Sequence, residues 1–127
     1  GTEGGGHTGR VATSALVPAV VQAAGGKPVL AAGGITTGAG LAASLALGAS
    51  GVWMGTRFVA SEEAHGHPNY KQKIVEANED STIITRCYSG KTLRTIKNRW
   101  TADWESRPQD ILPFPDQFKN SKDVYVV

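Results

Sequence analysis

The chain opens with the segment GTEGGGHTGR, which places a carboxylate, three consecutive glycines and a histidine within seven residues. His7 is a candidate general base, because the imidazole of a free histidine titrates near neutral pH. Glycine loses more backbone freedom on folding than any other residue, so the run from Gly4 to Gly6 is costly to order. Such a run is useful where the backbone must approach a ligand closely. The simpler alternative is that His7 is a turn residue that bonds to its own backbone.

Two further glycine turns follow short apolar runs: GGITTG begins at Gly33 after PVLAA, and GTR begins at Gly55 after GVWM. Ligands of parallel α/β sheets bind at the carboxyl ends of the strands, where glycines let backbone N–H groups approach a phosphate. No Asp or Glu occurs between Gly4 and Ser61, so no carboxylate would repel an anion there. The three turns therefore predict an anion site, with ordinary tight turns as the alternative.

The elements that would position these turns follow from the apolar pattern of the first half. Ser14 is expected to cap a helix whose buried face is either Leu16, Val20 and Ala23 or Val17, Val21 and Ala24, and Gly25-Gly26 should end it. We expect buried strands at Pro28 to Ala32 and Gly51 to Met54, joined by a helix over about Ala39 to Leu47. A strand, helix and strand in this order predict adjacent parallel strands.

The second half is richer in charged and aromatic residues. The spacing of Tyr70, Ile74 and Ala77 predicts a helix over Asn69 to Ala77. The segment from Thr82 to Tyr88 has the composition of a strand. From Asn98 onward we expect loops and short helical turns that pack through aromatic anchors.

Several motifs imitate sites that the sequence does not support. The run from Gly4 to Gly9 matches GxGxxG, but the acidic residue that a dinucleotide fold needs ~20 positions later is missing. SGKT (Ser89 to Thr92) lacks the first glycine of a phosphate loop, because that position is Thr85. Two groups of residues are more simply interpreted as solvated surface. The first, a candidate metal cluster, comprises His65 and His67 with Glu62 and Glu63. The second, a candidate nucleic-acid contact, is the basic series Lys91, Arg94, Lys97 and Arg99. We therefore expect no metal and no nucleic-acid partner.

Composition places the 127-residue chain among ordinary globular proteins, with 40% hydrophobic residues and a formal charge of +2. The lone Cys87 excludes an internal disulfide and is consistent with a reducing compartment, so we expect a cytoplasmic protein. No apolar run approaches the ~20 residues that span a bilayer, and no membrane association is expected.

The segments EGGGHTG and PVLAAGGITTGAGLAASLALGASGVWMGTRFVASEE, followed by HPNYK, closely resemble the nitronate monooxygenases, formerly called 2-nitropropane dioxygenases. The resemblance is dense over residues 1–63 and thin from Cys87 onward. It implies an α/β fold: the C-terminal part of a (β/α)8 barrel, about strands 6–8, with an irregular and helical C-terminal extension. Residues 1–63 would hold the barrel strands and phosphate loops, and residues 64–127 the peripheral part of the same domain.

The resemblance also implies bound FMN and oxidation of a nitronate or nitroalkane by O₂. The family's catalytic histidine falls on His7, and cofactor contacts fall on Gly5, Gly33, Gly34, Trp53, Met54, Gly55 and Thr56. The family commonly has glutamine where this chain has Trp53, so the resemblance carries over only backbone contacts at this position.

Two alternatives share the same motifs. One is a relative of the flavin-dependent enoyl-acyl-carrier-protein reductases, and the other is a non-catalytic remnant that binds flavin or phosphate. Because the chain starts without methionine, inside what resembles the loop after the sixth strand, we expect a fragment or a processed product, and a fragment would be inactive by itself.

Overall fold

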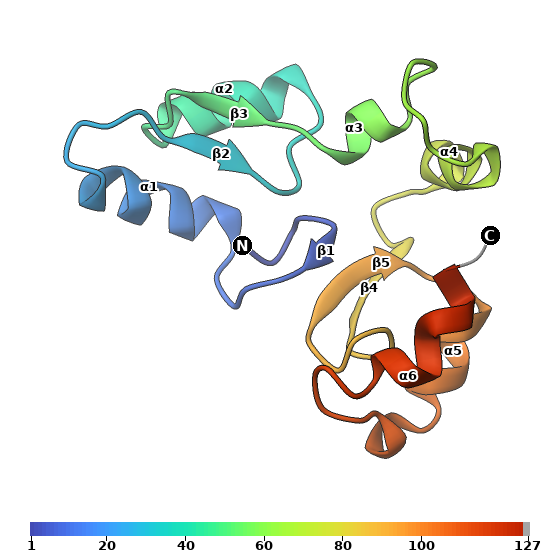
Figure 1. Cartoon of the computed structure of the whole chain (residues 1–127). Coiled ribbons are helices and arrows are strands. Elements are labelled where there is room, and N and C mark those ends of the chain that lie inside the picture. Colours follow the sequence, from blue (N-terminus) through green and yellow to red (C-terminus); the bar gives the residue numbers. More distant parts are fainter. Residues whose placement is uncertain (126–127) are drawn as a thin grey trace. The chain divides into compact units, whose positions relative to one another are not determined.

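The computed structural model describes residues 1–125, which form two compact units that we call unit 1 (residues 1–65) and unit 2 (residues 66–125). Unit 1 contains, in chain order, β1 (Gly6–His7), α1 (Thr13–Ala23), β2 (Leu30–Ala32), α2 (Gly38–Ala46), β3 (Gly51–Trp53) and α3 (Thr56–Val59). Unit 2 contains α4 (Pro68–Glu76), β4 (Thr82–Thr85), β5 (Leu93–Ile96), α5 (Arg99–Glu105) and α6 (Phe118–Ser121), with 3-10 turns at Pro108–Asp110 and Lys122–Tyr125. Figure 1 shows these elements along the chain.

In unit 1 the strands β2 and β3 pair in parallel, with Leu30 opposite Gly51 and Ala32 opposite Trp53. The helix α2 connects them, as Figure 1 shows. The predicted pair of parallel strands joined by a helix is therefore confirmed. Both strands are shorter than predicted: β2 begins two residues later, at Leu30, and β3 ends one residue earlier, at Trp53.

The core of unit 1 lies on one face of this strand pair. Its buried residues are Val17, Ala31, Ile35 and Ala49, and Val21, Leu47, Val52 and Met54 pack against them. Of the two faces predicted for α1, the one that contains Val17 and Val21 is buried, while Val20 is 41% exposed. The helix ends at Ala23 before Gly25 and Gly26, which both have positive φ, as predicted.

The predicted cap of α1 is wrong. The N-cap position is Ala12, which has no side-chain oxygen, and Ser14 lies inside the first turn. The carboxylate of Glu3 takes the role instead, since its Oε2 accepts a hydrogen bond of 2.7 Å from the backbone N–H of Thr13. A distant acceptor can replace a local cap when the fold brings it to the helix end.

Unit 2 contains an antiparallel hairpin in which β4 pairs with β5, with Thr82 opposite Ile96 and Thr85 opposite Leu93. The predicted strand from Thr82 to Tyr88 is too long, because the chain turns after Thr85. The pairing strand β5 was not predicted, since Arg94 within it and the basic residues that flank it suggested only a solvated surface. Arg94 in fact donates a hydrogen bond to Thr82 Oγ1 at 2.7 Å, across the hairpin.

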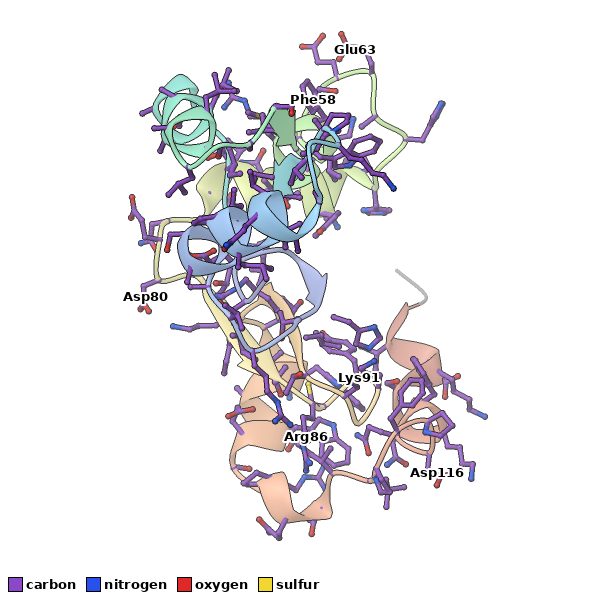
Figure 2. All side chains as sticks on the ribbon, turned by 90° about the vertical axis from the view of Figure 1, so that its left-hand side faces the viewer. Phe58, Glu63, Asp80, Arg86, Lys91 and Asp116 are labelled. Carbon is purple, nitrogen blue, oxygen red and sulfur yellow. The ribbon has the colours of Figure 1, made fainter. Side chains whose placement is uncertain are left out.

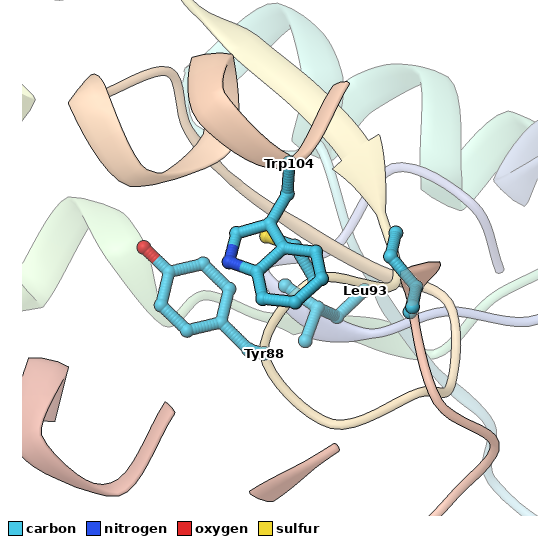
Figure 3. Packing of buried hydrophobic residues seen from close by; sticks show 5 residues of the cluster. Tyr88, Leu93 and Trp104 are labelled. Carbon is cyan, nitrogen blue, oxygen red and sulfur yellow. The ribbon is translucent and has the colours of Figure 1, made fainter. Parts of the chain in front are cut away.

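The core of unit 2 is aromatic, as predicted for the segment after Asn98. The buried cluster comprises Cys87, Tyr88, Leu93, Trp104 and Ile111, with Trp100 and Val124 packed against it. Figure 3 shows Trp104 lying between Tyr88 and Leu93 in this cluster. Cys87 is fully buried in this cluster, and this burial raises the pKa of its thiol. The predicted helix at residues 69–77 is also confirmed, as α4.

Gly90 explains the SGKT motif in structural terms. Its φ is +83°, and a Cβ at this position would lie 2.5 Å from the backbone of Leu112, Pro113 and Phe114. Only glycine fits there, because a side chain would collide with a segment that cannot move like a flexible side chain. The glycine therefore serves the packing of unit 2.

Candidate functional site

The three glycine turns of unit 1 meet in space. A Cβ built on Gly33 would lie 3.0 Å from the backbone N of Gly4 and 3.3 Å from its Cα, so these two turns are in backbone contact. A Cβ on Gly5 would lie 3.8 Å from Oγ1 of Thr56, which begins α3 after the third turn. The first turn thus contacts both others, and one of these contacts joins Gly5 and Thr56, which are 51 positions apart in the chain.

The turn at Gly33 and Gly34 has a backbone that other residues rarely adopt, with φ values of +99° and +73°. It follows directly after β2, at the carboxyl end of the strand. A Cβ on Gly34 would meet the Cβ of Glu3 at 3.0 Å. Gly34 is therefore constrained by its own φ and by Glu3, independently of any ligand.

Backbone donors are available at the same strand ends. Within residues 1–125, the N–H groups of Gly34, Gly55 and Thr56 donate to no acceptor of the protein. Gly55 has a φ of −100°, and a Cβ there would have nothing within 4 Å. Open space beside free donors at strand ends is what a phosphate or another anion needs.

His7 lies in β1, immediately after the glycines that contact the other two turns, and its side chain is exposed. Trp53, the last residue of β3, is 69% exposed, whereas its neighbour Met54 packs against the unit 1 core. The two side chains therefore lie on opposite faces. Met54 can offer a ligand only its backbone, while Trp53 can offer its ring.

An open cavity of about 250 Å³ lies beside the second turn. Its lining includes Glu3, Thr13, Gly34, Ser44 and Leu47. His7, Gly55 and Thr56 do not line it. The cavity therefore adjoins the converging turns without containing all of the predicted site residues.

Glu3 is the only acidic residue before Glu62, and its carboxylate, which accepts the Thr13 N–H, lies beside Gly34, so one negative charge stands next to the second turn. In residues 1–125 no group of three or more His, Cys, Asp and Glu side chains is placed to hold a metal. His67, weighed above as a ligand, accepts a hydrogen bond at Nδ1 from the N–H of Asn69 and so caps α4. Glu63, its neighbour in that motif, is exposed and extends away from the ribbon (Figure 2).

The family model of nitronate monooxygenases matches residues 1–126. The chain belongs to the nitronate monooxygenase family. Two relatives are a Mycobacterium tuberculosis protein provisionally named a monooxygenase and a Bacillus subtilis protein named a probable nitronate monooxygenase. The first is 50% identical over 89% of this chain and 30% of its own length. The second is 41% identical over 92% of this chain and 36% of its own length. The chain thus spans about a third of the curated relatives it matches.

Solved structures agree with this membership of the family. FabK from Thermotoga maritima matches with a TM-score of 0.76 at 43% identity, over 86% of this chain and 36% of its own. A nitroalkane oxidase from Streptomyces ansochromogenes matches with a TM-score of 0.78 at 30% identity, over 96% of this chain and 38% of its own. Both likenesses extend over unit 1 and unit 2.

The structure adds two residues that the sequence analysis overlooked, Glu3 and Thr13. Glu3 could have been noticed from the sequence, because it is the only acidic residue before Glu62 and stands directly before the glycines. No feature of the sequence pointed to Thr13, because its hydrogen bond to Gly33 joins positions 20 residues apart.

Proposed function

We propose that this chain forms the last strands of a (β/α)8 barrel, about strands 6–8, and that the full-length gene product oxidises nitronates or nitroalkanes with O₂ and bound FMN. The parallel pair β2–β3 with its intervening α2 is the repeating unit of such a barrel. Leu30 and Trp53 are exposed on the face opposite the core. Parallel strands are normally covered on both faces, so this face would form part of the barrel interior.

The observation that carries the proposal is the convergence of the three glycine turns with unpaired N–H groups at the ends of β2 and β3. In barrels of this class a phosphate binds at the loops after the last two strands. Gly34, Gly55 and Thr56 would donate to the FMN phosphate, with Gly33 completing the turn. Gly5 and the backbone of Trp53 and Met54 would border the cofactor.

His7 would act on the substrate. An unprotonated ring nitrogen of His7 takes the proton from the carbon next to the nitro group, or orients a nitronate that has already formed. FMN, when bound, accepts the electrons and supplies the reactivity toward oxygen. The exposed Trp53 ring would restrict the space available to substrate at the end of β3.

A flavin-dependent enoyl reductase relative is the second candidate. It is kept because the identity to FabK, 43%, exceeds the 30% identity to the nitroalkane oxidase. A non-catalytic flavin-binding protein is the third alternative, and it differs from both in having no turnover.

One set of assays on the full-length gene product separates the three. Oxygen uptake with nitroethane and its nitronate, together with a flavin absorption spectrum, supports the nitronate monooxygenase proposal. Efficient NAD(P)H oxidation with an enoyl thioester, and none with nitronate, would favour the reductase. A flavin spectrum without either turnover would leave only binding, and a protein that takes up no FMN would refute all three.

A further inference from the structure

Glu3 joins three segments that carry proposed site residues. Its Oε2 accepts the Thr13 N–H at 2.7 Å, which fixes the start of α1 to the segment that continues into Gly4 and His7. Its Cβ also lies where a side chain at Gly34 would have to go. One side chain therefore contacts both the first turn of α1 and the turn after β2.

Thr13 closes the connection from the other side. It is buried, with 9% of its surface exposed, and its Oγ1 donates a hydrogen bond of 3.2 Å to the carbonyl of Gly33. Gly33 in turn lies against the backbone of Gly4, the residue next to Glu3. The contacts run from Glu3 to Thr13, Gly33 and Gly4 and return to Glu3, which makes a closed ring.

The ring has a physical reason to depend on Glu3. Ala12, at the N-cap of α1, offers no side-chain acceptor, and the first turn of α1 carries no acidic residue. The partial positive charge of the helix N-terminus favours a carboxylate at this place. Without Glu3 the Thr13 N–H would lose its acceptor, and the turn at Gly33 and Gly34 would lose the side chain packed beside it.

We propose that Glu3 is a positioning residue, which holds the His7 loop and the Gly33–Gly34 turn in one fixed arrangement for flavin and substrate. This inference rests on the proposed function for its effect on FMN and turnover. The ring of contacts itself does not depend on that function, so it can be tested without cofactor.

Three variants of the full-length gene product test the proposal. Glu3→Ala removes the acceptor, whereas Glu3→Gln keeps an acceptor oxygen and removes only the charge. Thr37→Ala is the matched control, because Thr37 Oγ1 caps α2 by accepting the N–H of Gly40 at 3.2 Å. It removes the same kind of bond from the other long helix of unit 1 and leaves the ring intact.

The first measurement is amide hydrogen exchange of the protein without FMN. In Glu3→Ala we expect faster exchange at Thr13 and at residues 4–6, with the middle of α1 unchanged. Thr37→Ala should speed exchange at Gly40 and leave residues 4–6 as in the wild type. Unchanged exchange at Thr13 and residues 4–6 in Glu3→Ala would overturn the proposal.

The second measurement is FMN titration onto the apoprotein. Glu3→Ala should bind FMN about 10- to 30-fold more weakly, at the upper end of the effect of a lost helix cap. Glu3→Gln should stay within about fivefold of the wild type, because a charge at a helix end contributes less than the bond. Equal weakening in Glu3→Ala and Thr37→Ala would mean a general loss of stability and would contradict a positioning role.

The third measurement compares turnover with nitroethane and with its nitronate. If His7 acts as the base, its misplacement impairs the proton transfer most, and a displacement of about 1 Å costs on the order of 10²-fold. Glu3→Ala should therefore lose more turnover with nitroethane than with the nitronate, and Glu3→Gln should restore the wild-type ratio. A wild type without FMN or turnover would refute the proposed function, while the exchange experiment would still decide on the ring.

Discussion

Unit 1 and unit 2 complete their cores by different means. The buried residues of unit 1 are aliphatic, and several large apolar side chains remain exposed, including Trp53 at 69%, Phe58 at 63% and Leu30 at 54%. Unit 2 buries Tyr88 and Trp104 and also leaves large apolar side chains exposed, including Val75 at 68% and Phe114 at 52%. Its core bonds several polar groups internally, although Nε1 of Trp104 is buried without a hydrogen-bond partner among the described residues. The fully buried Gln117 donates to the Cys87 carbonyl at 2.9 Å and accepts the Leu112 N–H at 3.0 Å.

The two units thus differ in the kind of side chain that fills the core and in how their strands pair. A parallel strand pair needs cover on both faces, and the described part of unit 1 covers one. An antiparallel hairpin packed by helices needs cover on one face only, and unit 2 supplies it from its own aromatic residues. We therefore expect substitutions in unit 1 to affect binding and turnover, and substitutions in unit 2 to affect stability.

The largest expected effect is that of His7→Asn in the full-length gene product. Turnover with nitroethane should fall about 10²–10⁴-fold, the usual contribution of a general base. FMN content and thermal unfolding should match the wild type, because His7 is exposed. With the nitronate the loss should be much smaller, since the proton has already gone. Equal losses on both substrates would assign His7 to binding or orientation.

Trp104→Ala should produce the opposite pattern. Trp104 is 5% exposed in the aromatic cluster, so its removal should lower the free energy of unfolding by about 3–5 kcal/mol. Denaturant titration followed by circular dichroism measures this. Tyr70→Ala in the same unit is the control: Tyr70 is 51% exposed and should cost less than about 0.5 kcal/mol. Similar costs for both variants would contradict the description of unit 2.

Gly55→Ala should weaken FMN binding about ten- to a hundredfold, which corresponds to one lost hydrogen bond to a charged group. A Cβ at Gly55 would meet nothing within 4 Å in residues 1–125, so the described part of the chain gives no steric reason for an effect. A variant at Gly34 would be less informative, since strain and Glu3 would disturb the turn in any case. FMN affinity unchanged by Gly55→Ala would remove this turn from the site.

The smallest expected effect concerns acid stability. Hydrogen bonds from Lys73 and Gln72, and the charge of Lys73, lower the pKa of Glu76 in α4. A lowered pKa stabilises the folded state above the ordinary pKa of a glutamate, and this contribution disappears as the pH falls through the folded value. Melting of the wild type and Glu76→Gln should therefore converge at acidic pH and differ slightly at neutral pH. A difference that grows on acidification would contradict the sign.

The parts of the fold that could be predicted from sequence depend on local patterns. The apolar runs around Val29 and Val52, the glycines after α1 and the spacing of Tyr70 and Ile74 reflect rules that act over a few residues. The strand β5 was missed because Arg94 and the basic residues that flank the strand were interpreted as a solvated surface. The cap by Ser14 was wrong because a better acceptor, Glu3, reaches Thr13 through the fold.

The sequence by itself determined the family, through the glycine motifs and their spacing, and it marked His7, Gly33–Gly34 and Gly55–Thr56 as candidate site residues. These choices are local, since each motif requires a particular backbone at its own position. Only the tertiary structure showed that the three turns touch, that Met54 packs into the core while Trp53 remains exposed, and that Glu3 bonds to Thr13. Contacts between distant segments depend on how β2, β3 and α1 pack, and no local pattern in the sequence encodes that packing.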